Sequence, residues 1–570
     1  MLFCLRLCGR DLPRHAADAS WHVAMQNYQT LTAAFTWNLP ARYNIAAACA
    51  DDWARAAPRR VCLIEDRGEA PAVTLGYGEL ALSSRRLAAA MAAKGVGLGD
   101  RVAIVLPQSF QTAIAHLAVY RLGAIAVPLA MRFGPEALGF RLKAAGAKMA
   151  VLHRDGLETF GAVQDELPAL ESVVVVEGER DQGGDQLDFD RLIAETNGTI
   201  EDAATGPDDP ALIIFTSGTT GPPKGALHGH RVVLGHLPGI RFHHEDYPQA
   251  GDRIWTPSDW AWAGGLLNVL LPSLQLGVPV VFSSERFRAD EAYRLMARQG
   301  VRNAFLPATA LRMLAAAGDE PAVKDLTLRT IASAGESLPA ATYEWARRSL
   351  AITVNEFYGQ TECNMVLGSS AAHGVSRAGA IGKSVPGHVV ALLGADGREV
   401  PRGTPGTIAV KAPDPVMFLN YWQDPEATTA KFSGDWLITG DQAVMDEDGY
   451  VAFVGRDDDI ITSAGYRIGP GEVENCLLAH EAVKLAAVVG KPDPLRTEIV
   501  KAYVVLKDGQ PGSAALAADI QSFVRTKLSA HEYPREIAFV DEMPLTTSGK
   551  IVRRIFRERA HAEAAEAGEK

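Results

Sequence analysis

Short, continuous apolar runs alternate with alanine- and leucine-rich stretches from about residue 40 to about residue 450. Examples are RVAIVL at 101–106, which is followed by the helical pattern QTAIAHLAVYRLG, and then MAVLH at 149–153 and SVVVVEG at 172–178. Continuous valine and isoleucine runs between helices are typical of parallel strands that are buried on both faces. The pattern therefore predicts an α/β fold in which parallel-rich sheets and helices form several layers.

The length of the chain predicts more than one domain, because 570 residues exceed the roughly 250–300 residues at which single cores stop growing. The segment GRDDDIITSAGYRIG is dense in charge and glycine, and short mixed helices and strands follow it. We predict a large domain over 25–457 and a small, mobile α+β domain over 458–570. We expect residues 1–24 to be a disordered or non-native tail, with a short transit segment as the alternative, and the alanine- and glutamate-rich end at 559–570 to fray.

Charge and cysteine usage exclude several classes of protein. The formal net charge of −12 argues against general binding to nucleic acid or to an anionic membrane. The six cysteines form no CxxC pair, which favours free thiols in a reducing, cytoplasmic location over a disulfide framework or a zinc site. No apolar run reaches the roughly 20 residues that span a bilayer.

The most informative segment is an apolar strand followed by a loop of threonine, serine and glycine that ends in a lysine, ALIIFTSGTTGPPKG at 211–225. Glycines let backbone N–H groups approach a phosphate, hydroxyls add donors and the lysine adds charge. The loop is not a Walker A motif, since Lys224 is neither preceded by glycine nor followed by serine or threonine. The tripeptide Gly382–Ser384 imitates the end of one, but Arg377 stands where the first glycine belongs.

The loop TSGTTGPPKG resembles the signature of the adenylate-forming superfamily, which holds acyl-CoA synthetases, peptide-synthetase adenylation domains and firefly luciferase. Further motifs match in the expected order: SAGESL (333–338), YGQTE (358–362), TGD (439–441), GRDDDIITSAGYRIGPGEVE (455–474) and PLTTSGK (544–550). The resemblance is closest to medium-chain acyl-CoA synthetases and acetyl-CoA synthetase. It implies that ATP and a carboxylic acid give an acyl-adenylate and pyrophosphate, with Mg²⁺, and that coenzyme A then takes the acyl group.

The resemblance also implies the roles of individual residues in binding the nucleotide. Tyr358 resembles the aromatic residue that stacks on adenine, and Asp441 the carboxylate that accepts hydrogen bonds from the ribose hydroxyls. Arg456 resembles a ribose-contacting arginine, and Arg467 an arginine that meets phosphate in the adenylating pose. The expected nucleotide and coenzyme A contacts are Thr216, Ser217, Gly218, Thr219, Thr220, Gly221, Lys224, Gly335, Glu336, Tyr358, Gln360, Thr361, Asp441, Arg456, Gly465 and Arg467.

Four of the matched residues are candidates for catalysis: Lys224, Thr361, Glu362 and Lys550. Glu362 resembles the carboxylate that holds Mg²⁺. Lys550 resembles the lysine that enters the site for adenylation only, where its charge stabilises the transition state. In relatives this lysine is also a target of reversible acylation, which makes a lysine acyltransferase and a deacylase candidate partners.

Two residues of the charged, glycine-containing segment GRDDDIITSAGYRIG are expected to serve the second half-reaction. Gly465 resembles the glycine that lets the pantetheine arm pass the backbone. Asp458 takes the hinge position about which the small domain rotates, and the run Asp457–Asp459 leaves this assignment open by one residue.

Small residues surround the expected acyl pocket. In acetate-specific relatives a tryptophan stands where this chain has Gly359, so we expect an open channel and a medium-chain or branched acid. The other expected lining residues are Trp260, Trp262, Ala263, Gly264 and Ala334. The alternative is that the glycines only serve the backbone and a tryptophan refills the space, which would leave an acetyl- or propionyl-CoA synthetase.

Two further signals carry no function. His228, His230, His236, His243 and His244 cluster without the carboxylates or cysteines of a metal site. His230 is expected either near the acyl pocket or on the surface at a helix start. The basic run KIVRRIFRER is interpreted as a solvated helix face, with contact to the phosphates of coenzyme A left open.

Other functions stay open beside an acyl-CoA synthetase. A free-standing enzyme that loads a carrier protein is the main one, and a homodimer is compatible with the sequence. A non-catalytic sensor on the same fold is disfavoured by the presence of Lys224, Glu362, Asp441 and Lys550.

Overall fold

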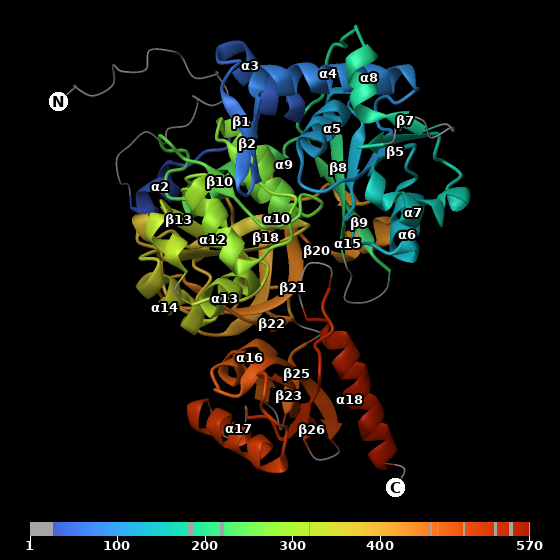
Figure 1. Cartoon of the computed structure of the whole chain (residues 1–570). Helices are drawn as coiled ribbons and strands as arrows, with labels where there is room; N and C mark the ends of the chain where they lie inside the picture. Colours follow the sequence, from blue (N-terminus) through green and yellow to red (C-terminus); the bar gives the residue numbers. More distant parts are fainter. Residues whose placement is uncertain are drawn as a thin grey trace, which may run out of the picture.

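A computed structural model of the chain has a large α/β part and a smaller C-terminal part (Figure 1). It describes residues 27–178, 186–216, 222–318, 320–456, 459–463, 466–493, 496–528, 533–546 and 551–568. The predicted fold class, a large N-terminal domain with parallel-rich sheets and a small C-terminal domain, is confirmed. The predicted tail at 1–24, the hinge residue Asp458 and the exact boundary lie outside the described residues.

The first sheet of the large part has nine strands. In spatial order they are β16 (Lys383–Ser384), β15 (Cys363–Gly368), β14 (Val354–Gln360), β13 (Thr330–Ser333), β12 (Asn303–Phe305), β10 (Ile254–Trp255), β11 (Val280–Phe282), β1 (Val61–Arg67) and β2 (Ala70–Gly76). The strands from β14 to β1 pair in parallel, and β15, β16 and β2 add antiparallel edges.

The second sheet has eight strands. They are β19 (Asn420–Tyr421), β9 (Lys224–Gly229), β8 (Pro210–Thr216), β4 (Ile125–Pro128), β3 (Arg101–Val105), β5 (Met149–His153), β6 (Ser172–Val176) and β7 (Gln186–Asp188). Strands β8 to β7 are parallel, while β9 and β19 are antiparallel. The apolar runs singled out in the sequence are β3, β5 and β6, which confirms their prediction as strands.

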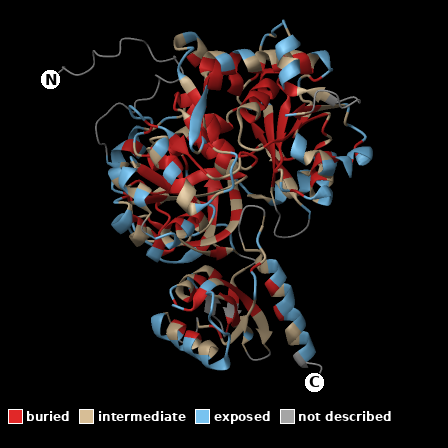
Figure 2. Cartoon of the chain, viewed as in Figure 1, coloured by how far each residue is buried: buried red, intermediate tan, exposed pale blue. Residues whose placement is uncertain are grey.

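Helices fill the space between the two sheets and cover their outer faces (Figure 2). One core joins residues of both sheets through α4 (Tyr77–Ala93), α5 (Phe110–Arg121), α9 (Val232–His243) and α11 (Leu271–Leu276). Helix α5 is buried on almost every side, which is why its sequence is mostly apolar. Ser109 caps its first turn by accepting a hydrogen bond from the Thr112 N–H. The remaining helices of the large part are α2 (Tyr28–Ala34), α3 (Asp52–Ala56), α6 (Pro135–Ala145), α7 (Leu157–Gly161), α8 (Phe189–Glu195), α10 (Ala263–Gly265), α12 (Ala289–Arg298), α13 (Ala308–Ala316), α14 (Ala340–Ser349) and α15 (Pro425–Ala430).

A third, antiparallel sheet closes the large part on the side of the small one (Figure 1). Its strands are β17 (Val390–Leu393), β18 (Pro405–Lys411), β21 (Trp436–Met445), β20 (Phe432–Ser433) and β22 (Val451–Arg456). Strand β21 alternates buried and half-buried residues, as expected for a strand with one face on a core. The motif TGD lies in β21, and Arg456 ends β22.

The small part is an antiparallel sheet with one parallel strand, packed against three helices. Its elements are β23 (Ile461–Ser463), β24 (Tyr466–Ile468), α16 (Pro470–Leu478), β25 (Val483–Asp493), β26 (Thr497–Leu506), α17 (Ala514–Lys527), β27 (Glu536–Phe539) and α18 (Arg553–Gly568). The short mixed helices and strands predicted after GRDDDIITSAGYRIG are therefore present.

The expectation that residues 559–570 fray is wrong for 559–568, which belong to α18. Phe556 and Ala560 are buried, and the Phe556 ring stacks on Tyr503 with 4.4 Å between centroids. A spacing of four residues places both side chains on one face of the helix, so the alanine-rich end is held by packing. Among the residues that the structure describes, no helix is both long enough and apolar enough to cross a membrane.

Candidate active site

Residues from three separate motifs meet in one hydrogen-bonded network at the junction of β14, β21 and β22. The Tyr358 hydroxyl donates to Asp441 Oδ2 at 2.5 Å, and the Gln360 amide donates to the same oxygen at 2.6 Å. The Gln360 amide also donates to the Thr439 carbonyl at 2.9 Å. Arg456 Nε lies 3.6 Å from Asp441 Oδ1. YGQTE, TGD and the end of the large domain are therefore joined around one carboxylate.

Strand register explains why these side chains meet. Tyr358 and Gln360 are two residues apart on β14, so they point to the same side of the sheet. Asp441 and Arg456 are directly paired across β21 and β22. Burial, and next the negative charge of Asp441, raise the pKa of Tyr358 well above its usual value, so its hydroxyl stays protonated and donates.

The ends of the phosphate loop are fixed by an antiparallel pair of strands. Thr216 and Lys224 are register partners of β8 and β9, and the Thr216 hydroxyl donates to the Lys224 carbonyl at 3.4 Å. The loop residues Ser217, Gly218, Thr219, Thr220 and Gly221 lie outside the described residues.

Tyr421 connects this loop to the YGQTE motif. Lys224 Nζ lies 5.4 Å from the centroid of the Tyr421 ring, and the Tyr421 hydroxyl donates to Glu362 Oε1. Strand β19 places it there, because Tyr421 pairs with Ala226 of β9. Two catalytic candidates, Lys224 and Glu362, thus flank one tyrosine, and the half-buried Thr361 precedes Glu362 in the chain.

Glu362 is compatible with a bound Mg²⁺. Its carboxylate is buried, and only Oε1 receives the Tyr421 hydroxyl. No group of three or more histidine, cysteine or acidic side chains that could hold a metal occurs among the described residues. Mg²⁺ at phosphates typically takes one or two carboxylates and keeps several waters. A single carboxylate beside a phosphate loop fits that pattern.

Gly335 and Glu336 stand slightly apart from the network. Gly335 has a φ of +89°, a conformation that favours glycine. Glu336 accepts hydrogen bonds from the Thr309 hydroxyl at 2.8 Å and from Arg312 at 3.2 Å. Its carboxylate is therefore engaged by α13 in this conformation.

The interpretation of Gly359 as the missing wall of an open channel needs correction. A Cβ at this position would lie 2.5 Å from the Asn364 Cα and 2.5 Å from the Met365 nitrogen. The absent side chain therefore faces the backbone of β15, and a larger residue requires the hairpin to move. Close backbone approach, the alternative weighed from the sequence, accounts for this glycine.

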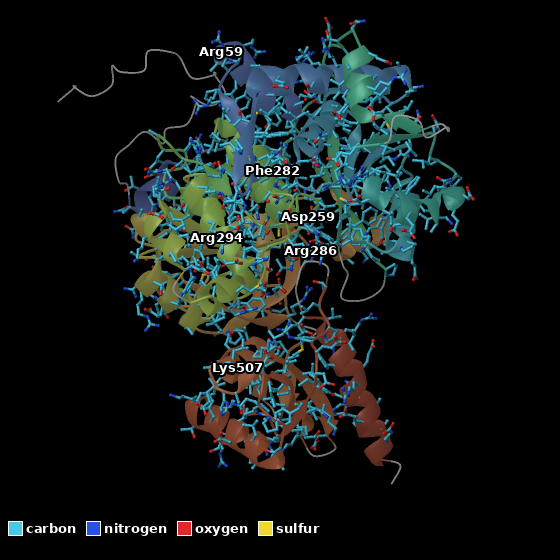
Figure 3. All side chains as sticks on the ribbon, in the orientation of Figure 1. Arg59, Asp259, Phe282, Arg286, Arg294 and Lys507 are labelled. Atoms are coloured by element: carbon cyan, nitrogen blue, oxygen red, sulfur yellow. The ribbon has the colours of Figure 1, made fainter. Side chains whose placement is uncertain are left out.

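The other expected lining residues divide between two apolar cores. Trp260, expected to line an open channel, is instead buried in the core, with its ring 5.5 Å from that of Phe282, which Figure 3 labels. Ala334 is buried in the same core, and Ala263 packs against it. A Cβ on Gly264 would lie 3.1 Å from Phe305 Cε1. Trp262 is half-buried and meets Phe133 edge-on at 5.8 Å.

Three further expected residues lie outside the described residues, namely Asp458, Gly465 and Lys550, and so does the side chain of Arg467. Their roles stay predictions. The histidines after the phosphate loop are buried, so the expected surface position of His230 is wrong: its Nδ1 accepts the Ile45 N–H at 3.2 Å. Desolvation lowers the pKa of His230 to about 4, which keeps the ring neutral.

The basic face of α18 is largely paired with acids. Arg553 bonds Glu474, Arg557 bonds Asp459 at 3.0 Å, and Arg559 bonds Glu563 at 3.2 Å. These ion pairs compete with the phosphate contacts that the sequence left open.

Two polar residues of this region were missed from the sequence. Glu356 lies on the same face of β14 as Tyr358, and the alternation of the strand could have revealed it. Lys431 donates to Gln360 Oε1 at 3.2 Å, but it belongs to none of the matched sequence motifs.

Comparison with known proteins assigns the chain to a family. A model of AMP-binding enzymes matches residues 50–422, and a model of the AMP-binding enzyme C-terminal domain matches residues 472–550. The acetyl-coenzyme A synthetase of Bacillus subtilis is 35% identical over 462 residues, which cover 80% of each chain. The human mitochondrial acyl-coenzyme A synthetase ACSM4 is 33% identical over 541 residues, which cover 91% of each chain.

Solved structures show the same architecture. The anthranilate CoA ligase AuaEII, in complex with anthranoyl-AMP, has a TM-score of 0.83 at 28% identity, covering 92% of this chain and 99% of its own. An acyl-CoA synthetase of Brucella canis is 33% identical with a TM-score of 0.71, covering 94% of this chain and 99% of its own. These similar proteins differ in the acid that their names state.

Proposed function

The chain belongs to the AMP-binding enzyme family and is an ATP-dependent acyl-CoA synthetase, and we propose that its acid is medium-chain or branched and that the network around Asp441 binds ATP. The proposal that this network binds ATP rests on the convergence of Tyr358, Gln360 and Arg456 on the Asp441 carboxylate. A buried carboxylate only accepts hydrogen bonds, which suits it to the paired hydroxyls of a ribose.

The first half-reaction needs charge neutralisation and positioning more than a protein nucleophile, since the substrate carboxylate itself attacks the α-phosphorus. In this proposal Lys224 and Thr216 hold the phosphates, and Thr361 lies beside the α-phosphate. Glu362, oriented by Tyr421, would hold Mg²⁺, which supplies charge neutralisation at the phosphates. Lys550 would act in adenylation only, and its reversible acylation would remove that function.

The proposal of a larger acid does not rest on Gly359, and we place the acid at the apolar region around Phe305, Ala334 and Gly264. Its support is the shared core that joins Trp260, Phe305 and Ala334. An apolar surface of this kind stabilises a bound acyl chain by about 0.8 kcal/mol per buried methylene. Relatives named for acetate and for anthranilate show that membership of the family alone does not select the acid.

The substrate proposal is tested by measuring pyrophosphate exchange with straight acids from acetate to decanoate, branched acids and benzoate. We expect the highest kcat/KM with medium-chain or branched acids, graded over chain length because one methylene discriminates by only about 10–200-fold. A preference for acetate over butyrate and hexanoate would overturn it.

Gly264→Ala tests the position of the site in the same assay. Its Cβ pushes the Phe305 ring, so the ratio of hexanoate to butyrate activity should fall by roughly 10-fold. Gly161→Ala is the matched control, since a Cβ there has open space. An unchanged ratio in Gly264→Ala would place the acyl chain elsewhere.

We further propose a cytoplasmic location, since the four cysteines among the described residues are free thiols. A homodimer stays an open proposal.

A further inference from the structure

Lys431 belongs to none of the matched sequence motifs, yet its side chain contacts the network around Asp441. It follows the last turn of α15 and precedes β20, and its side chain is half-buried. The ammonium donates to Gln360 Oε1 at 3.2 Å and to the Thr439 carbonyl at 3.3 Å. Two of its three N–H donors are thus directed at the strands β14 and β21 that form the network.

The contact with Lys431 specifies one orientation of the Gln360 amide. With Oε1 facing the ammonium, Nε2 faces Asp441 Oδ2 at 2.6 Å and the Thr439 carbonyl at 2.9 Å. The opposite orientation would turn the amide oxygen toward two acceptors and the NH₂ group toward a cation. Such an arrangement leaves several buried polar groups unsatisfied, which is costly.

The oriented amide in turn fixes the carboxylate of Asp441. Oδ2 receives both Gln360 and the Tyr358 hydroxyl, so the carboxylate cannot rotate freely and Oδ1 stays turned toward Arg456. Because Oδ2 already receives two donors, an approaching ribose hydroxyl meets Oδ1 held in a preset orientation. Preorganisation of this kind lowers the cost of ordering on binding.

We propose that Lys431 is a positioning residue for ribose recognition, acting through Gln360 on Asp441. The proposal rests on the assignment of Asp441 to the ribose, which is part of the proposed function. Lys431 need not touch the nucleotide itself. Its loss should therefore weaken recognition of the ribose hydroxyls specifically, and leave contacts with adenine and phosphates in place.

The backbone around Lys431 does not depend on its side chain. Its N–H donates to the Thr428 carbonyl at 3.1 Å, and its carbonyl accepts from the Ile438 N–H at 2.8 Å. Variants at this position should keep the α15–β21 connection. Lys431→Met retains the length of the side chain without charge, and Lys431→Arg restores a charged donor.

The experiment compares ATP with 2′-deoxy-ATP and 3′-deoxy-ATP, using calorimetric binding to the full chain and kcat/KM in pyrophosphate exchange. Lys431→Met should weaken ATP roughly 10-fold and the deoxynucleotides much less, so the preference for ATP collapses. Lys431→Arg should recover most of it. Lys411→Met is the control. Lys411 is an exposed lysine of β18, the strand that pairs with β21, and it lies 3.9 Å from Asp435.

Asp441→Asn separates the two proposals. If it keeps the preference for ATP over the deoxynucleotides, the ribose role of Asp441 is wrong and the proposal for Lys431 falls with it. If Asp441→Asn loses the preference but Lys431→Met keeps it, only the proposal for Lys431 is overturned. Equal weakening of all three nucleotides by Lys431→Met, with a lowered melting temperature, would also overturn it in favour of a structural role.

Discussion

Glu356, on the same strand as two residues of the network around Asp441, differs from them in how its side chain ionises. It lies on the face of β14 that carries Tyr358, and its Oε1 accepts the Leu338 N–H at 3.2 Å. Desolvation raises the pKa of its carboxyl group to about 7. The unfolded chain releases this proton near the ordinary glutamate pKa of about 4.3. The folded protein therefore retains a proton that the unfolded chain loses.

This difference predicts a pH dependence of stability with a definite sign. Below about pH 4.3 both states are protonated and Glu356 has no effect, whereas between about pH 4.3 and pH 7 its contribution increasingly favours unfolding. Relative to Glu356→Gln, the natural protein should lose roughly 1–3 kcal/mol of unfolding free energy between about pH 5 and about pH 8. Urea unfolding at several pH values measures this.

Glu447→Gln, which changes an exposed carboxyl group, is the control for Glu356. It should show no comparable divergence from the natural protein. A constant difference between Glu356→Gln and the natural protein across this range would contradict the assigned titration.

At this scale the sequence predicted residues that belong to motifs and missed those that do not. Tyr358, Gln360, Asp441 and Arg456, which the resemblance assigns to the nucleotide, meet in one network. Lys431 was missed because its position depends on how β20 and β21 fold back, a tertiary feature that no local pattern encodes.

At the scale of elements, the β14–β15 hairpin is the feature that the sequence interpreted least well. Its register shifts between Tyr358 and Gln360, and Met365 on the opposite strand has a φ of +55°. These irregularities bring the strands so close at Gly359 that no side chain fits. Sequence alone could not distinguish a glycine that opens a pocket from one that lets two backbones approach.

Gly359→Ala should therefore destabilise the protein, because its Cβ would lie 2.5 Å from backbone atoms of residues 364 and 365. We expect a loss of about 1–3 kcal/mol in unfolding free energy, together with reduced activity on all acids. Thermal unfolding beside Gly161→Ala, where a Cβ meets open space, measures it. A stable Gly359→Ala variant that only favours shorter acids would restore the pocket interpretation.

Regular elements were predicted well for a simple reason. Strands β3, β5 and β6 are buried on both faces, so their sequences are continuously apolar. The end of helix α18, from residue 559, was predicted to fray because alanine and glutamate dominate it, and the buried side chain of Ala560 shows that this end is packed.

At the scale of the whole molecule, the predicted boundary between the large and small parts falls at residues 457–458, which lie outside the described residues. The chain is anchored on both sides of them. Arg456 is paired with Asp441 of the large part, and Asp459 is bonded to Arg557 of α18 at 3.0 Å. Fixed flanks concentrate any rotation in the residues between them, which supports Asp458 as the proposed hinge.

The central claim is that one chain performs adenylation and then thioester formation, with Lys550 acting only in the first. The most direct measurement follows the two half-reactions separately, as pyrophosphate release from ATP and hexanoate, and as hexanoyl-CoA formation from pre-made hexanoyl-adenylate. The natural protein should perform both. Lys550→Ala should slow the first by roughly 10²–10³-fold and spare the second, because a charge used in one transition state is removed. Equal loss in both half-reactions, or failure of the natural protein to transfer the acyl group to coenzyme A, would contradict the account.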